Sequence, residues 1–186
     1  MFSFSHINNT NTNNKFEVIM VDYKTYIKEV PNFPVEGVNF KDISPLLRST
    51  HWKQVIKEMG SLVEIPDYWV GVDARGFLFA SALSYKFGGG IIMCRKKGKL
   101  PPETISYKYE TEYSEDELEI QIGKGDVVVV DDVLATGGTI QAVNDLCNNA
   151  GYEVKDNLVL IDLKYVPRVS WFDLNVRSLL QYESVR

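Results

Sequence analysis

Along the chain, short apolar runs alternate with segments whose hydrophobic residues recur at helical spacing. The apolar runs that have the composition of buried strands are Tyr68–Val72, Gly90–Cys94, Val127–Val130 and Val154–Leu163. Helical spacing follows over Phe77–Phe87 and after Gly138. This alternation predicts an α/β fold with a doubly wound, mostly parallel sheet. In such sheets the ligand lies beyond the carboxyl ends of the strands.

The pattern before Tyr68 is less regular. A helix is predicted over Val21–Val30, where Pro31 ends it. Phe33–Leu47 is predicted to be a loop, and it is long for a mere connector. The next helix is predicted to begin near Thr50. Its apolar stripe consists of Trp52, Val55, Ile56, Met59 and Val63.

Three further segments complete the chain. Thr104–Gln121 alternates and is rich in charge and tyrosine, which predicts a hairpin or a mobile flap. The C-terminal stretch is expected to hold one more short strand or an extended tail. Residues 1–15 include NNTNTNN, so we expect a disordered Asn-rich tail there and a single domain over residues 16–186.

The most informative motif is VVVVDDVLATGGT, which covers Val127–Thr139. A strand that delivers the small-residue loop Ala135-Thr136-Gly137-Gly138-Thr139 to a helix N-terminus builds an anion site, because backbone N–H groups converge there. Glycine lets the backbone approach a phosphate closely. The alternative is a strand cap followed by a tight turn. The motif is neither a Walker A loop nor a GxGxxG fingerprint.

Two acids, Asp131 and Asp132, stand where this strand is predicted to end. They would repel a phosphate unless they face something else. A ribose diol and Mg²⁺ are the natural candidates, because both favour oxygen acceptors. The pattern therefore indicates a phosphate at the loop and a sugar at the acids.

Two other strand ends carry charge. Asp73-Ala74-Arg75-Gly76 offers backbone N–H groups and a guanidinium at a helix start. Arg95–Lys99 holds four cations in five residues, which on its own is equally typical of a solvated face. Because the carboxyl ends of parallel strands share one edge, we expect all three segments to meet there. A sugar with a monophosphate at one end and a diphosphate at the other would satisfy them.

Composition narrows the class of protein. The chain has 186 residues, 45% hydrophobic and 24% charged, with a net charge of −5, which argues against a general nucleic-acid binder. No apolar run has the length of a membrane span. Cys94 and Cys147 suggest neither a metal site nor a disulfide framework, so a reducing, cytoplasmic location is the default expectation. His6 and His51 are poor candidates for a catalytic base.

These motifs resemble the phosphoribosyltransferase family of the type I fold, and more narrowly its members that act on adenine. The resemblance extends from about Phe33 to Tyr182. It is carried by FPVEGVNFKDISPLL, DARGFLFA, RKKGKLP, YETEYSEDELEI, VVVVDDVLATGGT and LLQYE. The phosphoribosyl motif indicates only the class, whereas the combination of the first and third with Glu112-Tyr113 points to adenine. The resemblance implies a small N-terminal hood and a flexible catalytic loop.

The resemblance also implies the reaction and most roles. Adenine and phosphoribosyl diphosphate would give AMP and pyrophosphate, a reaction of purine salvage. Mg²⁺ would be held mainly by the diphosphate substrate, and the sequence identifies no protein ligand of the metal with certainty. The 5′-phosphate would bind Ala135–Thr139, and the ribose would face Asp131 and Asp132. Pyrophosphate would bind Asp73, Ala74, Arg75, Arg95, Lys96 and Lys99, and the Asp73–Ala74 peptide would be cis. Adenine would lie near Asn39, Phe40 and Lys41, largely on backbone groups.

In the family pattern Glu112 is the general acid or base, and Tyr113 lies beside it on a closing loop. Some basic groups would reach in from a partner subunit, which implies a homodimer. The chain departs from the pattern at Lys41, which replaces an Arg, at Ser114, which replaces a Gly, and at Ala74, which replaces a Ser. None of these changes removes a group that the chemistry needs.

Two other functions remain open. One is transfer to another base, such as hypoxanthine, guanine or xanthine, since backbone recognition is hard to infer from side chains. The other is a ligand-sensing regulator built on the same fold. A regulator should carry a nucleic-acid-binding domain or a basic surface, and this chain has neither.

Overall fold

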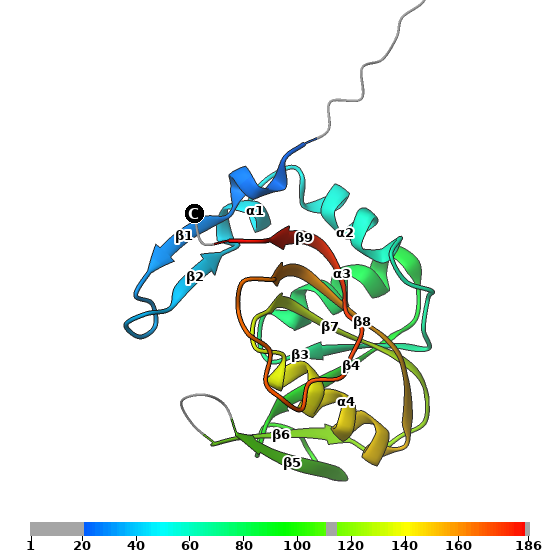
Figure 1. Cartoon of the computed structure of the whole chain (residues 1–186). Helices are drawn as coiled ribbons and strands as arrows, with labels where there is room; N and C mark the ends of the chain where they lie inside the picture. Colours follow the sequence, from blue (N-terminus) through cyan, green and yellow to red (C-terminus); the bar gives the residue numbers. More distant parts are fainter. Residues whose placement is uncertain (1–20, 111–114, 185–186) are drawn as a thin grey trace, which may run out of the picture.

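The computed structural model describes residues 21–110 and 115–184. Its centre is a seven-stranded sheet in the order β5-β6-β4-β3-β7-β8-β9 (Figure 1). The strands are β3 (Tyr68–Val72), β4 (Gly90–Lys96), β5 (Thr104–Glu110), β6 (Glu115–Gln121), β7 (Gly125–Leu134), β8 (Tyr152–Leu163) and β9 (Arg177–Tyr182). Neighbours from β4 to β9 run parallel, whereas β6 pairs antiparallel with β4 and β5. The predicted α/β fold with a mostly parallel central sheet is confirmed.

Helices cover both faces of this sheet. On one face α2 (Trp52–Gly60) and α3 (Gly76–Phe87) pack over Val128 and Val130. On the other face α4 (Gly138–Ala150) packs over Val127 and Val129. Each apolar run thus supplies two cores, because successive side chains of a strand point to opposite faces.

The helices predicted near Thr50 and over Phe77–Phe87 are present with small shifts. The helix predicted near Thr50 begins at Trp52, and Val55, Ile56 and Met59 are buried. Val63 lies beyond its end but still packs against the same core. The helix predicted over Phe77–Phe87 begins one residue earlier, at Gly76.

The N-terminal region over residues 21–47, which we call the hood, differs from the prediction. Only the short 3-10 helix η1 (Tyr23–Tyr26) forms inside the helix predicted over Val21–Val30, and the chain then enters β1 (Lys28–Pro31). The predicted loop contains β2 (Asn39–Asp42) and the one-turn helix α1 (Ser44–Leu47). β1 and β2 form a separate antiparallel sheet. The helix prediction is wrong because the pairing of β1 with β2 overrides the local preference for a helix.

Strands β5, β6 and β9 answer two questions that the sequence left open. β5 and β6 form the hairpin, and β9 is a strand parallel to β8. β7 continues to Leu134. Asp131 and Asp132 therefore lie inside the last residues of this strand and not, as predicted from the sequence, after its end. The strand is longer than predicted because β8 pairs with it as far as Asp162. The proposed tail over residues 1–15 lies outside the described residues. No helix in the described ranges is long and apolar enough to cross a membrane.

Candidate active site

The three charged strand ends meet at one edge of the sheet, as predicted. β3 lies between β4 and β7, with Val72 opposite Cys94 and Gly71 opposite Val130. The residues that follow these positions therefore emerge side by side. We call this place the crevice, meaning the edge formed by Asp73–Gly76, Arg95–Lys99 and Asp131–Thr139.

The loop before α4 has the geometry of an anion site. Gly137, the residue that caps α4, has φ +87°, a conformation that side chains disfavour. A Cβ on Gly137 would also lie 2.4 Å from the Phe172 ring. Two carbonyl groups of this loop accept hydrogen bonds from residues after β8. Val169 N donates to Thr136 O at 2.9 Å, and the Arg168 guanidinium donates to Ala135 O. The backbone of the loop is thus held by residues after β8.

Arg168 is a residue that sequence reasoning missed. Its guanidinium binds Asp162, a buried carboxylate near the end of β8, as well as the carbonyl of Leu163 at 3.2 Å. Lys164 Nζ also lies 2.6 Å from the Asp162 carboxylate. No local pattern in the sequence marks this network, since it depends on residues after β8 folding back onto the loop before α4.

Asp131 and Asp132 form an acidic pair in which Asp132 is buried and Asp131 is half-buried. Burial and the neighbouring Asp132 charge raise the pKa of Asp131 well above its usual range. Burial likewise raises the pKa of Asp132, although the guanidinium of Arg75 acts in the opposite direction. Arg75 Nε lies 2.9 Å from Asp132 Oδ2, an oxygen that accepts no hydrogen bond of normal geometry. The pair is therefore rich in acceptor capacity, which suits hydroxyl donors.

The Asp73 loop and the basic strand end are bound to each other. The Asp73–Ala74 peptide is cis, as the resemblance implied. Arg95 Nε lies 3.3 Å from Asp73 Oδ2, and Arg95 NH1 donates to Lys99 O at 3.2 Å. Gly76 starts α3 so close to β7 that a Cβ there would lie 2.5 Å from Val130 O. Arg95 therefore connects the Asp73 loop to the backbone of Lys99, and Lys96 continues β4 at an exposed position.

The buried carboxylate of Glu119 accepts hydrogen bonds from the backbone of the basic strand end. Glu119 Oε1 accepts from Lys99 N at 2.6 Å and from Leu100 N at 2.7 Å. Burial acts to raise the pKa of Glu119, but the amides of Leu100, Gly98 and Lys99 outweigh it and the pKa is lowered. Glu119 is a second functional candidate that sequence reasoning missed. Glu119 lies opposite Arg95 in the antiparallel β4–β6 pair, and this position follows from the strand register, which the sequence pattern does not give.

The three residues expected near adenine do not share one face. The Phe40 ring lies 4.8 Å from the Arg75 guanidinium, at the crevice. Asn39 Nδ2 donates to Glu29 Oε2 at 3.0 Å, and the Lys41 ammonium binds Glu29 as well. The side chains of Asn39 and Lys41 therefore point away from Arg75, because neighbours on a strand alternate.

Glu112 and Tyr113 lie outside the described residues. The strands on either side are paired up to Glu110 opposite Glu115. Tyr109, on the strand before the turn, is buried, and its hydroxyl lies 3.4 Å from Thr139 Oγ1. This contact connects the β5–β6 hairpin to the start of α4.

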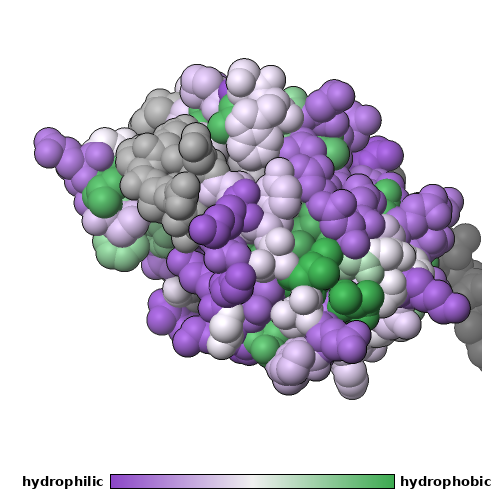
Figure 2. All heavy atoms as spheres, turned by 90° about the horizontal axis from the view of Figure 1, so that it is seen from below, coloured by the Kyte–Doolittle hydropathy of each residue, from purple (hydrophilic) through white to green (hydrophobic). Residues whose placement is uncertain are grey.

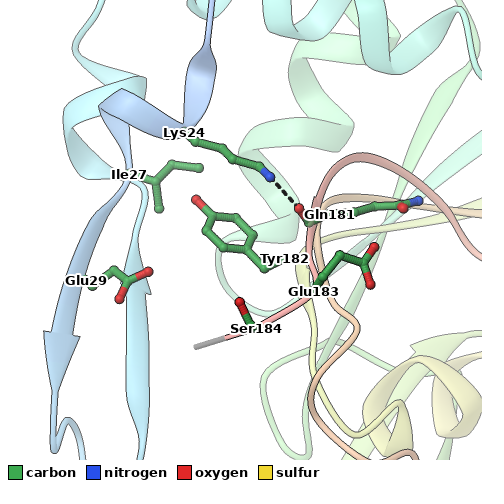
Figure 3. A pocket seen from close by; sticks show the side chains of 7 residues that line it. All are labelled: Lys24, Ile27, Glu29, Gln181, Tyr182, Glu183 and Ser184. Carbon is green, nitrogen blue, oxygen red and sulfur yellow. Dashed lines mark hydrogen bonds between the residues drawn. The ribbon is translucent and has the colours of Figure 1, made fainter. Parts of the chain in front are cut away.

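Cavities and surface show where else a ligand has room. A cavity of about 230 Å³ lies away from the crevice, between the hood and the end of β9 (Figure 3). It is lined by Lys24, Ile27, Glu29, Gln181, Tyr182, Glu183 and Ser184. The face of the molecule seen from below is largely hydrophilic, with a small group of hydrophobic residues near its middle (Figure 2).

A metal ion would find few protein ligands at the crevice. Among residues 21–110 and 115–184, no three His, Cys, Asp or Glu side chains converge to hold one. Asp131 and Asp132 supply two carboxylates, and one of their oxygens is unsatisfied. This donor set fits Mg²⁺, which commonly binds one or two carboxylates together with substrate phosphates.

The loop before α4, the acidic pair and the basic strand end meet at one edge of a mostly parallel sheet, which is where such sheets bind their ligands. Residues 53–162 match the model of the phosphoribosyl transferase domain, and the chain belongs to this family. It is 46% identical over 164 residues to the adenine phosphoribosyltransferase of Hydrogenovibrio crunogenus, covering 85% of this chain and 95% of the relative.

Solved structures agree. The adenine phosphoribosyltransferase of Thermoanaerobacter pseudethanolicus superposes with a TM-score of 0.78 at 38% identity, covering 86% of this chain and 98% of that one. The enzyme from Saccharomyces cerevisiae, solved with D-2,5-dideoxy-2,5-imino-altritol 1,6-bisphosphate and adenine, has a TM-score of 0.75 at 34% identity, covering 85% and 96%. Within its family the chain groups with the adenine phosphoribosyltransferases.

Proposed function

We propose that this protein transfers the 5-phosphoribosyl group from phosphoribosyl diphosphate to adenine, giving AMP and pyrophosphate in purine salvage. The observation that carries the proposal is the meeting of the phosphate loop, the Asp131–Asp132 pair and the basic strand end at one crevice. One bond from the anomeric carbon to pyrophosphate breaks, and one to a purine nitrogen forms. The adenine phosphoribosyltransferases among the relatives support the choice of base.

Ala135, Thr136, Gly137, Gly138 and Thr139 would bind the 5′-phosphate. The positive φ of Gly137 and the start of α4 at Gly138 support this, since backbone N–H groups at a helix start attract phosphate. Asp131 and Asp132 would accept hydrogen bonds from the ribose hydroxyls. The buried Asp132 Oδ2, which accepts no hydrogen bond from the described residues, supports this role because it leaves an acceptor free for a hydroxyl.

Arg75, Arg95, Lys96 and Lys99, with the backbone at Asp73 and Ala74, would bind the departing pyrophosphate. The contact between Arg95 and Asp73 supports this role, because it draws the two loops towards one ligand. Preorganised cations at a leaving group stabilise the charge that develops there. Mg²⁺, held mainly by the diphosphate and within reach of Asp131 and Asp132, would neutralise part of the same charge.

Adenine would lie against Phe40, with backbone groups of Asn39–Lys41 reading its edge. The distance of 4.8 Å between the Phe40 ring and Arg75 supports a base site next to the pyrophosphate site. Glu112 would exchange a proton with the base, and Tyr113 would close over it. A general acid or base typically contributes about 10²–10⁴-fold to the rate.

A homodimer is part of the proposal. Leu78 and Tyr85 on α3 and Ile91 and Met93 on β4 are exposed, at 48%, 95%, 45% and 45%. Such residues on adjacent elements are typical of a protein interface. The same elements lead into Arg75 and Arg95, so a partner there would adjoin the crevice. Cys94 and Cys147 are free thiols, which suits the proposed cytoplasmic location.

A substrate panel tests the proposal. Purified full-length protein with Mg²⁺ and phosphoribosyl diphosphate should convert adenine to AMP far faster than it converts hypoxanthine or guanine. Comparable rates with all three bases would overturn the assignment to adenine. Product formation with none of them would overturn the activity itself.

A further inference from the structure

A lysine of the hood is buried in an arrangement that the proposed reaction does not use. The side chain of Lys41 is 0% exposed. Glu29 stands opposite Lys41 in the β1–β2 pair, and its carboxylate binds the Lys41 ammonium. The same ammonium lies 4.3 Å from the centre of the Tyr182 ring. We call Glu29, Lys41 and Tyr182 the hood clasp.

The clasp joins two sheets. Glu29 and Lys41 belong to the small hood sheet, whereas Tyr182 ends β9 of the central sheet, opposite Leu163 of β8. Lys164 N donates to Tyr182 O at 2.9 Å and anchors the backbone of this residue. Figure 3 shows the Tyr182 ring between the hood residues Lys24, Ile27 and Glu29 and the end of the chain.

A second cation adds to the junction. Lys24 Nζ lies 4.8 Å from the centre of the Tyr182 ring and donates to Gln181 O at 2.5 Å. One aromatic ring therefore receives two ammonium groups, both from the hood. A buried ammonium is costly unless it is paired, so the position of β2 depends on both the carboxylate and the ring.

The residue beside Lys41 faces the crevice. Side chains alternate along β2, so holding Lys41 on one face sets the place of Phe40 on the other. The Phe40 ring lies 4.8 Å from the Arg75 guanidinium and 5.1 Å from the Phe33 ring. A shift of β2 away from β9 would therefore move Phe40 relative to Arg75.

We infer that Tyr182 and Glu29 are positioning residues, which act through Lys41 to hold the base side of the crevice against the pyrophosphate side. The inference rests on the proposed function. It assigns the C-terminal strand a part in adenine binding without contact to adenine.

Initial rates of the full-length protein test the hood clasp. Adenine is varied at saturating phosphoribosyl diphosphate, and phosphoribosyl diphosphate is then varied at saturating adenine. We expect Tyr182→Leu to raise the KM for adenine about tenfold, the scale of a lost buried cation–π contact. The KM for phosphoribosyl diphosphate should change less than about twofold, because its loops keep their contacts. Tyr182→Phe keeps the ring and should restore most of the adenine affinity.

Tyr26→Leu is the matched control. Tyr26 is a tyrosine of η1 in the hood, and its ring packs on His51 with the ring centres 5.0 Å apart. It should lower the stability of the hood without changing the ratio of the two KM values. Glu29→Gln, a smaller change, tests the same clasp if Tyr182→Leu does not fold.

Lys41→Met supplies the double-mutant comparison. In that background Tyr182→Leu should add little further change to the KM for adenine, since the contact is already lost. Fully additive effects, or equal changes in both KM values, would overturn the clasp. A parent protein that is inactive on adenine would instead overturn the proposed function, and the clasp inference with it.

Discussion

Arg75 and Asp132 form an ion pair across two neighbouring strand ends, with Arg75 Nε 2.9 Å from Asp132 Oδ2. The Asp132 side chain is 4% exposed and that of Arg75 is 39% exposed. The guanidinium therefore neutralises a buried acid while it keeps an open side towards the crevice. A polyanion that enters the crevice would meet Arg75 already oriented.

Asp132→Asn should separate stability from activity. The amide keeps the shape but removes one of two like charges from a buried site, so the free energy of unfolding should stay unchanged or rise by about 1 kcal/mol. The catalytic efficiency kcat/KM should fall at least about tenfold, since a ribose acceptor and a partner of Arg75 are lost. Thermal unfolding and initial rates measure the two effects. Asp126→Asn, at an exposed acid, should change neither.

The acidic pair also predicts a pH dependence of stability. The pKa of Asp131 is raised in the folded state, so the folded chain holds this proton more tightly than the unfolded chain. Stability should therefore decline as the pH rises from below the ordinary aspartate pKa through the raised value. Denaturant unfolding at a series of pH values measures this slope. It should flatten in Asp132→Asn, and an unchanged slope would contradict the coupling.

Gly137→Ala should disable the phosphate loop. The new Cβ would lie 2.4 Å from the Phe172 ring, at a residue with φ +87°. We expect a loss of stability of about 1–3 kcal/mol and a sharp rise in the KM for phosphoribosyl diphosphate. Gly37→Ala is a close control for stability, because Gly37 has φ +87° and nothing within 4 Å of its added Cβ. If both variants lose the same stability, the contact with Phe172 is unimportant.

Glu119→Gln should loosen the basic strand end. The carboxylate accepts the amides of Lys99 and Leu100, and its replacement should cost about 1–2 kcal/mol and weaken pyrophosphate binding. The pKa of Glu119 is lowered in the folded state, so its contribution is present above the ordinary glutamate pKa. It is lost as the pH falls through the lowered value. Inhibition of the reaction by added pyrophosphate measures the weaker binding. The control Glu117→Gln, at a more exposed carboxylate that pairs with Lys97, should change this inhibition less.

Glu112→Gln should lower kcat by about 10²-fold or more, the usual scale of general acid–base help. The KM for phosphoribosyl diphosphate should change little, because the phosphate loop is unaltered. Steady-state rates with adenine measure both constants. An unchanged kcat would remove Glu112 from the mechanism.

The central sheet could be predicted because its signals are local. Apolar runs such as Val127–Val130 identify strands, and a Gly-rich turn before a helical stripe identifies an anion site. The rule that parallel strands place their carboxyl ends at one edge then brings Asp73, Arg95 and Asp131 together without any knowledge of contacts.

The hood could not be predicted in the same way. β1 has no strong strand signal of its own, and it forms because β2 pairs with it. The helix expected over Val21–Val30 therefore gives way to a strand. The supports behind the site depend equally on distant contacts, as between Arg168 and Ala135 or between Glu119 and Lys99.

By itself the sequence determined the central sheet and the Gly-rich loop that precedes α4, because hydrophobic period and loop composition act over a few neighbouring residues. Only the tertiary structure decided which side chains face the crevice. It turned Phe40 towards Arg75 and Lys41 towards Tyr182. The reason is physical: the direction of a side chain follows from strand register and from the burial of charge, and both depend on segments far apart in the chain.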